Sequence, residues 1–389
     1  MSKKALVIGL GFAGSVLART LADAGFSVTA IEKRAHVGGN MFEYERANGV
    51  RVHLYGPHIF HTNITRVYDY LSKFSSFYPY SHRVLGKIDG KLVPIPFNFT
   101  SIDELFLPNR AEYLKSILIA AFPGRERIQI SDLLENNDPD IHNLGCFIFE
   151  KVFVGYSCKQ WGIPIEMVDQ SVINRVPVII GTDDRYFSDS IQMMPLFGFT
   201  VLFEKMLDHP NVHINLNTDA FSRIRLHADA DKVLLDGVPF DGPVCYTGAI
   251  EDLFDSVLGS LPYRSLDLRF EDHHIDCYQT SAVINFPNDE FYTRISEFKH
   301  ITLQDVPEET TILKEYPISY QPGSNMVPFY PIQSESSRKK HLDYLSLSRK
   351  YEDLYLCGRL AEYTYYNMDA VIDKALSLAE KILSSKKYE

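Results

Sequence analysis

Three glycines near the N-terminus have the spacing of a site that binds the phosphates of a dinucleotide. They form a GxGxxG pattern, with Gly9, Gly11 and Gly14, directly after the apolar run 5–8. Glycine here allows a tight turn, a close backbone approach to a pyrophosphate, and close packing of a helix whose N-terminus favours negative charge. Glu32 ends a second apolar run, where a carboxylate can accept both hydroxyls of an adenosine ribose. The residues expected at the dinucleotide are Gly9, Gly11, Phe12, Ala13, Gly14, Glu32 and Lys33.

A second set of residues favours FAD over NAD as the dinucleotide. Gly38-Gly39-Asn40 follow Glu32 at a distance that suits another close backbone approach to a large cofactor. Near the C-terminus, the apolar run 354–357 leads into Gly358-Arg359, and Asn367-Met368-Asp369 open the last expected helix. A helix N-terminus there can face the flavin pyrimidine and favour negative charge on a reduced flavin. The alternative is an ordinary final strand and helix.

Together with further segments, these motifs give the sequence a family resemblance. Over essentially its whole length it resembles the bacterial UDP-galactopyranose mutases. The additional matching segments are YGPHIFHT at 55–62, GYSCKQWG at 155–162, NRVP at 174–177, DRYF at 184–187, YTRI at 292–295, KEY at 314–316 and residues 358–369.

The resemblance implies an isomerase that uses FAD in its reduced form. Members of this family interconvert UDP-galactopyranose and UDP-galactofuranose. N5 of the reduced flavin attacks the anomeric carbon and UDP leaves, with no net redox change. The resemblance also implies a homodimer, an external reductant such as NAD(P)H, and a product that supplies galactofuranose for cell-surface polysaccharide.

The residues implied to be catalytic are arginines and histidines. Arg175 and Arg294 are expected at the diphosphate, because two forked guanidinium groups suit a dianion that gains charge as it leaves. His58 and His61 lie in a loop expected to pass the flavin ring, together with Ile59, and Arg359 is expected near the flavin N5 edge. Two histidines three positions apart, with no third ligand, predict no metal site.

A further group of residues is implied to hold the substrate. The uracil is expected to stack on Tyr156, with Trp161 shaping the same pocket. For a single aromatic residue, a place in the core is the alternative. The other expected contacts to the diphosphate and sugar are Tyr186, Asn285, Tyr316 and Tyr365.

Several positions depart from the family pattern. Asn367 stands where some members have an aspartate, which puts any general base there in doubt. His82 stands where others have an asparagine that contacts uracil, Val152 where a phenylalanine can occur, and Ser157 in place of threonine. The resemblance also implies a mobile flap, around 161–169 and 178–187, that closes over UDP.

The segments that must position these residues predict an α/β protein with a Rossmann-like FAD-binding domain, an inserted helical bundle domain and an antiparallel β-sheet domain. The FAD-binding domain is expected from residues 1–78, 195–258 and 340–389, the helical domain from 101–172, and the sheet domain from 79–100, 173–194 and 259–339. The smaller elements expected are a loop at 53–61, a hairpin at 84–96 that turns at Asp89-Gly90, helices at 200–207 and 369–385, and strands at 27–31, 212–216, 243–247 and 354–357.

Composition limits the partners of the protein. The formal net charge of −11 argues against binding to nucleic acid or to an anionic membrane surface. No apolar run approaches the roughly 20 residues that a spanning helix requires. The five cysteines form no CxxC pair, and buried, reduced thiols in a cytoplasmic protein are the expected arrangement.

Three alternative functions remain open from the sequence. A flavin oxidoreductase of the amine-oxidase type would share every glycine motif. A non-catalytic protein that binds a flavin or a nucleotide sugar would also share them, although the His58–His61 loop and Arg359 argue against it. Within the family, UDP-N-acetylgalactosamine is an alternative substrate, and keeping His58 in the GPH run favours plain galactose.

Overall fold

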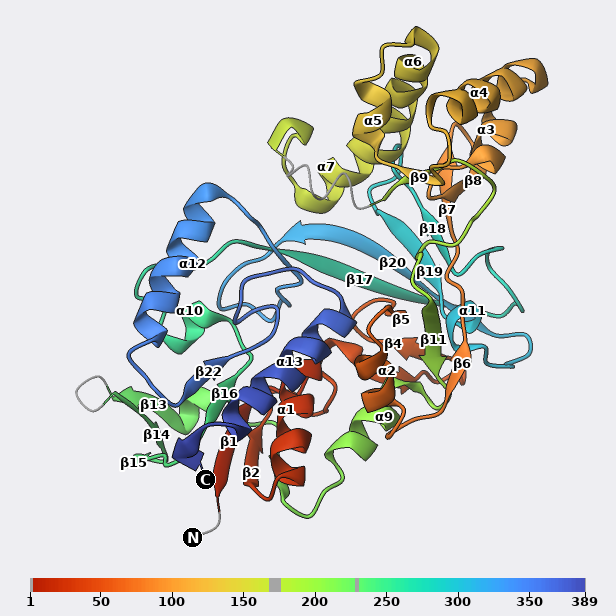
Figure 1. The fold of residues 1–389 in the computed structure, drawn as a ribbon. Helices are drawn as coiled ribbons and strands as arrows, with labels where there is room; N and C mark the ends of the chain where they lie inside the picture. Colours follow the sequence, from red (N-terminus) through yellow and green to blue (C-terminus); the bar gives the residue numbers. More distant parts are fainter. Residues whose placement is uncertain (1–2, 168–175, 228–230, 389) are drawn as a thin grey trace.

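The computed structural model describes residues 3–167, 176–227 and 231–388. Its base is a five-stranded parallel sheet in the order β12-β2-β1-β16-β22. These strands are β1 (Lys4–Ile8), β2 (Ser27–Ile31), β12 (Val212–Asn215), β16 (Val244–Tyr246) and β22 (Leu354–Leu356). The strands expected at 27–31, 212–216, 243–247 and 354–357 are therefore confirmed, and they belong to one sheet. The sheet joins residues from both ends of the chain, as Figure 1 shows.

Three helices cover this sheet and share one hydrophobic core with it. They are α1 (Phe12–Asp23), α9 (Gly198–Leu207) and α13 (Met368–Leu383). Apolar residues on α13, including Ile372, Ala375 and Ala379, are fully buried against the same core as Val16 and Leu17 of α1. Burying this apolar surface fixes α1 and α13 side by side (Figure 1), so the helix starts at Phe12 and Met368 are held on one scaffold.

A second, seven-stranded sheet lies above the first in Figure 1, in the order β21-β17-β20-β19-β18-β7-β8. Its strands are β7 (Val84–Ile88), β8 (Lys91–Ile95), β17 (Tyr263–His273), β18 (Val283–Asn285), β19 (Arg294–Glu297), β20 (Thr310–Ser319) and β21 (Tyr330–Pro331). The predicted hairpin turns at Asp89 and Gly90, whose φ values of 47° and 80° are those of a tight two-residue turn. The sheet is mixed rather than purely antiparallel, because β18 and β7 pair in parallel.

The segment 173–194 was expected to join this sheet, but its described strands belong to other sheets, and an isolated bridge between Arg185 and Arg83 links it to the start of β7. β10 (Val178–Ile179) pairs with β9 (Arg127–Ile128), next to the helical region. β11 (Ile191–Pro195) forms a three-stranded sheet with β5 (Phe60–Thr62) and β6 (Phe77–Pro79). The expected loop 53–61 is likewise bounded by strands, since β4 (Arg51–His53) enters it and β5 begins at its end. Short alternating runs contain no information about their pairing partner, which explains these errors.

The helical region rises at the top of Figure 1 and has its own core of apolar side chains, among them Ile102, Leu114, Leu118 and Ile141. It comprises α3 (Phe99–Leu105), α4 (Pro108–Ala121), α5 (Ile130–Leu134), α6 (Pro139–Ile148), η2 (Phe149–Val154) and α7 (Gly155–Trp161). Asn98 caps α3 by accepting a hydrogen bond from the Ser101 backbone N–H. The widened helical turn η2 directly precedes α7, and such turns occur often at functional sites.

Smaller elements complete the fold. They are η1 (Gly39–Met41), β3 (Glu43–Glu45), α2 (Thr65–Leu71), η3 (Ile165–Met167), η4 (Ala220–Ser222), β13 (Ile224–His227), β14 (Lys232–Leu235), β15 (Val238–Pro239), α10 (Ile250–Leu253), α11 (Lys299–Thr302), α12 (Glu335–Ser348) and η5 (Lys386–Tyr388). The sequence interpretation missed α12, which Ser334 caps by accepting from the Ser337 N–H. The α/β class is confirmed, whereas the domain boundaries stay a prediction.

Two further expectations concern the membrane and the cysteines. Within the described ranges, no helix combines the length and apolar character that crossing a bilayer requires. All five cysteines are free thiols, but only Cys245 and Cys357 are buried. Cys146 and Cys277 are exposed and Cys158 is half-buried, so the expectation of buried thiols is wrong for these three.

Candidate functional site

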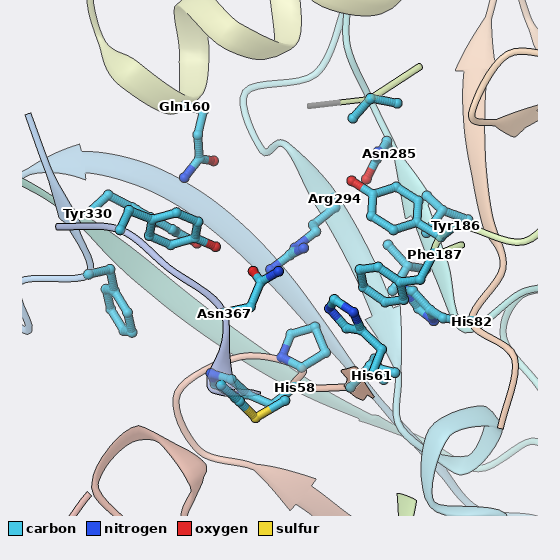
Figure 2. Close-up of a pocket in the computed structure, with 18 of the residues that line it drawn as sticks. His58, His61, His82, Gln160, Tyr186, Phe187, Asn285, Arg294, Tyr330 and Asn367 are labelled. Carbon is cyan, nitrogen blue, oxygen red and sulfur yellow. The ribbon is translucent and has the colours of Figure 1, made fainter. Parts of the chain in front are cut away.

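A cavity of about 490 Å³ lies where the helical region, the seven-stranded sheet and the C-terminal helix meet. Figure 2 shows its centre, with Arg294 pointing inward between Tyr330 and Asn367 on one side and Asn285 and Tyr186 on the other. Many of the residues predicted from the sequence line this cavity: His58, Ile59, His61, His82, Tyr156, Trp161, Tyr186, Asn285, Arg294, Arg359, Tyr365, Asn367 and Met368. Its size is ordinary for a small-ligand site.

The glycine loop between β1 and α1 has the close backbone contacts that the sequence predicted. Gly9 has a φ of 89°, in the left-handed region that favours glycine. A Cβ on Gly14 would lie 1.8 Å from the Gly9 carbonyl oxygen, and one on Gly39 would lie 2.9 Å from the Gly11 Cα. Two glycine-containing segments therefore cross here at backbone distance, beside the N-terminus of α1.

The Glu32 carboxylate is buried beneath this loop. It accepts hydrogen bonds from the backbone N–H groups of Leu10 at 2.7 Å and of Arg34 at 2.9 Å. A carboxylate offers about four acceptor positions, so these two bonds leave capacity for ribose hydroxyls. Lys33 next to it is exposed.

The start of α13 faces the cavity from the other end of the chain. Asn367 precedes the helix and makes no side-chain cap, and both Asn367 and Met368 line the cavity. Asp369 accepts a hydrogen bond from the Thr62 hydroxyl at 2.9 Å, which ties α13 to β5. Arg359 is aligned by a bond from its Nε to the Tyr366 carbonyl at 2.8 Å, and its guanidinium lies 4.2 Å from the Tyr365 ring centre.

The main positive charge at the centre of the cavity comes from the seven-stranded sheet. Asn285, Arg294 and Glu315 stand opposite one another on β18, β19 and β20, so their side chains share one face of the sheet. Arg294 Nε donates to Glu315 Oε1 at 2.7 Å, and Glu315 is 1% exposed. Burial works to lower the pKa of Arg294, but the Glu315 carboxylate together with Tyr156 and Tyr330 outweighs it, so that pKa lies well above its ordinary value. The guanidinium is therefore a fixed charge, with its remaining donors available to an anion.

Three histidines, His58, His61 and His82, form another part of the cavity wall. His61 Nδ1 donates to the Asp189 carboxylate at 2.8 Å, and its ring stacks on Phe187 at 3.6 Å. Burial, with the nearby His53 and Arg359, lowers the pKa of His58 well below its ordinary value of 6.5. Burial also lowers the pKa of His82 to about 3, and Arg294 adds to this effect. His58 and His82 are therefore neutral at physiological pH.

The neutral state of His82 predicts a specific loss of stability in acid. Between pH 6.5 and about 3 the unfolded chain binds a proton at this residue and the folded chain does not, so stability falls as pH falls. The slope is about 1.4 kcal/mol per pH unit for one such histidine. We expect His82→Asn to remove this contribution, as measured by urea unfolding at several pH values from 7 to 4.

The exposed His213 provides the matched control for this experiment. We expect His213→Asn to lose as much free energy of unfolding between pH 7 and pH 4 as the parent protein does. If the parent and His82→Asn lost stability in parallel over this range, the proposed neutral state of His82 would be wrong.

Four of the aromatic residues that line the cavity form one wall and come from three segments. Tyr156 and Trp161 lie on α7, Tyr330 on β21, and Tyr365 in the loop before α13. The Trp161 and Tyr330 rings lie 6.1 Å apart, and those of Tyr330 and Tyr365 lie 5.4 Å apart. Burial raises the pKa of both Tyr156 and Tyr330, so their hydroxyls are neutral donors. This wall offers ring faces for a base and O–H groups for phosphate oxygens.

Some residues predicted for the site lie elsewhere. Tyr316 is adjacent to Glu315 on β20, and strand alternation places its ring on the opposite face, against Arg269 and Tyr292. Val152 packs against two hydrophobic cores, and Ser157 is buried on α7 away from the lining.

Phe12, predicted at the cofactor, belongs to the hydrophobic core. Phe12 packs on Phe203 with ring centres 4.6 Å apart, so its side chain is part of the core. Arg175 and residues 168–169 of the expected flap lie outside the described part of the chain.

The cavity also contains residues that the sequence interpretation missed. Arg127 on β9 lines it, and its Nη2 is buried and makes no hydrogen bond within the described residues. Arg127 stands in an unremarkable GRER run, so only the tertiary structure reveals it. Phe187 lines the cavity from within a resemblance segment, and Glu315 lies behind Arg294 without lining the cavity itself. The other missed lining residues include Tyr55, Gln160, Ser188, Asp189, Phe329 and Tyr330.

Comparison with known proteins gives two matches to family models. Residues 151–365 match the family described as UDP-galactopyranose mutase, and residues 7–74 match an NAD(P)-binding Rossmann-like domain. A UDP-galactopyranose mutase from Mycoplasma pneumoniae is 34% identical over 384 residues, which cover 97% of this chain and 96% of the relative. A dTDP-fucopyranose mutase from Escherichia coli is 30% identical over 386 residues, 99% of each chain.

A solved structure supports the same fold. The crystal structure of a reduced UDP-galactopyranose mutase superimposes with a TM-score of 0.73 at 14% identity, and the alignment covers 98% of this chain and 94% of that one.

Proposed function

The chain belongs to the UDP-galactopyranose mutase family and is therefore an isomerase, and we propose that it interconverts UDP-galactopyranose and UDP-galactofuranose with bound FAD. The observation that carries the substrate assignment is the half-buried Arg294 guanidinium, which points into a cavity walled by Tyr156 and Tyr330. A fixed cation among neutral hydroxyl donors suits the diphosphate of a nucleotide sugar. Family membership does not favour the amine-oxidase-type or non-catalytic alternatives.

The residues present fit FAD at both ends of the chain. Gly11 and Gly39 cross without side chains between them, which lets their backbone approach the cofactor closely. The N-terminus of α1 favours the pyrophosphate, and Glu32 would hold the ribose. The N-terminus of α13, with Asn367 and Met368 at the cavity, would face the isoalloxazine ring. When bound in its reduced form, the flavin supplies the nucleophile for the anomeric carbon.

The chain's own residues would perform the remaining tasks. Arg294 would bind the diphosphate and stabilise the charge that develops on it as the bond to the sugar breaks, with Arg127 as a second cation. The uracil would lie against Tyr156 and Trp161. His61, fixed by Asp189, would orient the sugar beside the neutral His58.

The test is product analysis with three nucleotide sugars. We expect dithionite-reduced protein to convert UDP-galactopyranose into a furanose product that separates on HPLC, and oxidised protein to convert none. UDP-N-acetylgalactosamine and dTDP-fucopyranose are the comparison substrates, the second because a relative of that name aligns over the whole chain. No furanose from UDP-galactopyranose under reducing conditions would contradict the proposal, and a higher kcat/KM with dTDP-fucopyranose would reassign the substrate.

Three properties remain further proposals. We propose that the protein works in the cytoplasm, as a homodimer, and that an external donor such as NAD(P)H reduces the flavin. The five unpaired thiols support a reducing compartment. We also propose, from the nature of the product alone, that its galactofuranose goes into a cell-surface polysaccharide.

A further inference from the structure

A cluster of metal-ligand side chains lies outside the cavity, where β19 ends and α11 begins. Cys277 Sγ, Glu297 Oε2 and His300 Nε2 all lie within 4.8 Å of one another, and none of the three residues lines the cavity. We propose that these three side chains form a zinc(II) site. Their spacing along the sequence does not suggest one, because Cys277, in the loop between β17 and β18, approaches the other two only in the folded chain.

The distances between the ligand atoms match a tetrahedral zinc ion. Sγ lies 3.7 Å from the Glu297 oxygen and 3.4 Å from the His300 nitrogen, and these two lie 3.3 Å apart. Zinc bonds of about 2.3 Å to sulfur and about 2.0–2.1 Å to nitrogen or oxygen, at tetrahedral angles, require separations of about 3.3–3.6 Å. One ion can therefore contact all three atoms with little movement.

The ligand types also select the metal. A thiolate and an imidazole favour zinc over magnesium or calcium, which prefer oxygen ligands alone. With a neutral imidazole, one thiolate and one carboxylate balance the two positive charges of the ion, and binding releases the Cys277 thiol proton. The backbone carbonyl oxygen of Gln279 lies 2.8 Å from both Sγ and Nε2, next to the three ligand atoms.

The surrounding structure holds two of the ligands in place before a metal binds. Glu297 is 1% exposed, and its carboxylate accepts hydrogen bonds from the Tyr278 N–H, the Gln279 N–H and the Thr310 hydroxyl. His300 is carried on α11 three residues later, at the right of Figure 1. Cys277 is exposed, so an ion can reach the site from solvent. Such support around the ligands is what a metal site requires.

The metal-free chain has a competing arrangement of the same groups. The Gln279 carbonyl can accept hydrogen bonds from both the Cys277 thiol and His300 Nε2, which satisfies them without an ion. The nearby cation, Lys299, is directed at other carbonyls, those of Asp276, Val306 and Glu309. In the metal-free arrangement Cys277 is a thiol, and in the zinc-bound arrangement it is a thiolate bound to the ion. This difference can be measured.

Cobalt(II) substitution provides the decisive experiment. We expect flavin-loaded protein, stripped of metal and kept reduced with a phosphine, to bind one equivalent of cobalt(II) with the visible bands of a tetrahedral thiolate site at wavelengths beyond the flavin absorption. One equivalent of zinc(II) should abolish these bands. Cys277→Ser and His300→Gln should each weaken zinc binding by more than about 10-fold, because even the loss of an outer partner of a metal ligand costs 10–100-fold.

The chain offers a matched control in Cys146, which lies 3.4 Å from His142 on α6 without a carboxylate at that pair. Cys146→Ser should leave the bands and the zinc affinity unchanged. Thermal unfolding without metal shows whether each variant is folded. The proposal is overturned if the parent shows no tetrahedral bands, or if folded Cys277→Ser keeps the parent's zinc affinity. Neither result bears on the isomerase activity, because the cluster lies outside the cavity.

Discussion

Replacing Arg294 with lysine should lower kcat/KM for UDP-galactopyranose by about 10²–10³-fold, the usual cost of losing one group that stabilises developing charge. Lysine keeps the positive charge and can still pair with Glu315, so the buried carboxylate is not left alone. It loses the planar fork that binds two phosphate oxygens at once. Because the diphosphate gains charge as it leaves, most of the loss should appear in kcat, measured on the reduced enzyme by furanose formation.

Arg269 is the matched control for this variant. It lies on β17 of the same sheet, pairs with Asp267 and packs on Tyr316, on the face away from the cavity. Arg269→Lys should keep kcat/KM within about 2-fold, because exposed ion pairs contribute little. If Arg294→Lys were folded, held flavin and kept the parent's kcat/KM, the diphosphate role of Arg294 would be wrong.

The part of the site that the sequence predicted best is set by local backbone geometry. Gly9 requires a left-handed φ, and Gly14 has no room for a Cβ beside the Gly9 carbonyl. A left-handed φ and the lack of room for a Cβ both restrict the residue to glycine, so a short sequence pattern reveals these positions. The strands β1 and β2, before and after α1, were predictable for a different reason: a buried parallel strand appears as a continuous apolar run.

The part that the sequence predicted less well depends on register and on distant contacts. Glu315 and Tyr316 are neighbours within one matching segment, yet only Glu315 faces Arg294, and one residue of register decides between them. Arg127 and Tyr330 reach the cavity from β9 and β21, two-residue strands whose local sequence has no distinctive pattern. Their contribution follows from packing between regions far apart in the chain, which propensity and periodicity do not describe.

Replacing Gly39 with alanine should yield protein that is folded but largely without flavin. The added Cβ would lie 2.9 Å from the Gly11 Cα and 3.3 Å from the Gly11 nitrogen, so the two segments would separate where the cofactor backbone is expected. The measurement is flavin absorbance per chain after purification. Stabilisation by added FAD is a second readout, since ligand at 100 times the Kd stabilises the parent by about 2.7 kcal/mol and should not stabilise the variant.

Gly25 separates this clash from backbone strain. Its φ of 88° is also left-handed, so alanine there costs about 1–2 kcal/mol of conformational energy, but a Cβ would meet nothing within 4 Å. Gly25→Ala should therefore lose stability and keep its flavin, whereas Gly39→Ala should lose its flavin. Equal flavin loss in both variants would mean that strain, and not the close crossing of Gly11 and Gly39, controls binding. Full flavin content in Gly39→Ala would contradict the placement of the cofactor at this crossing.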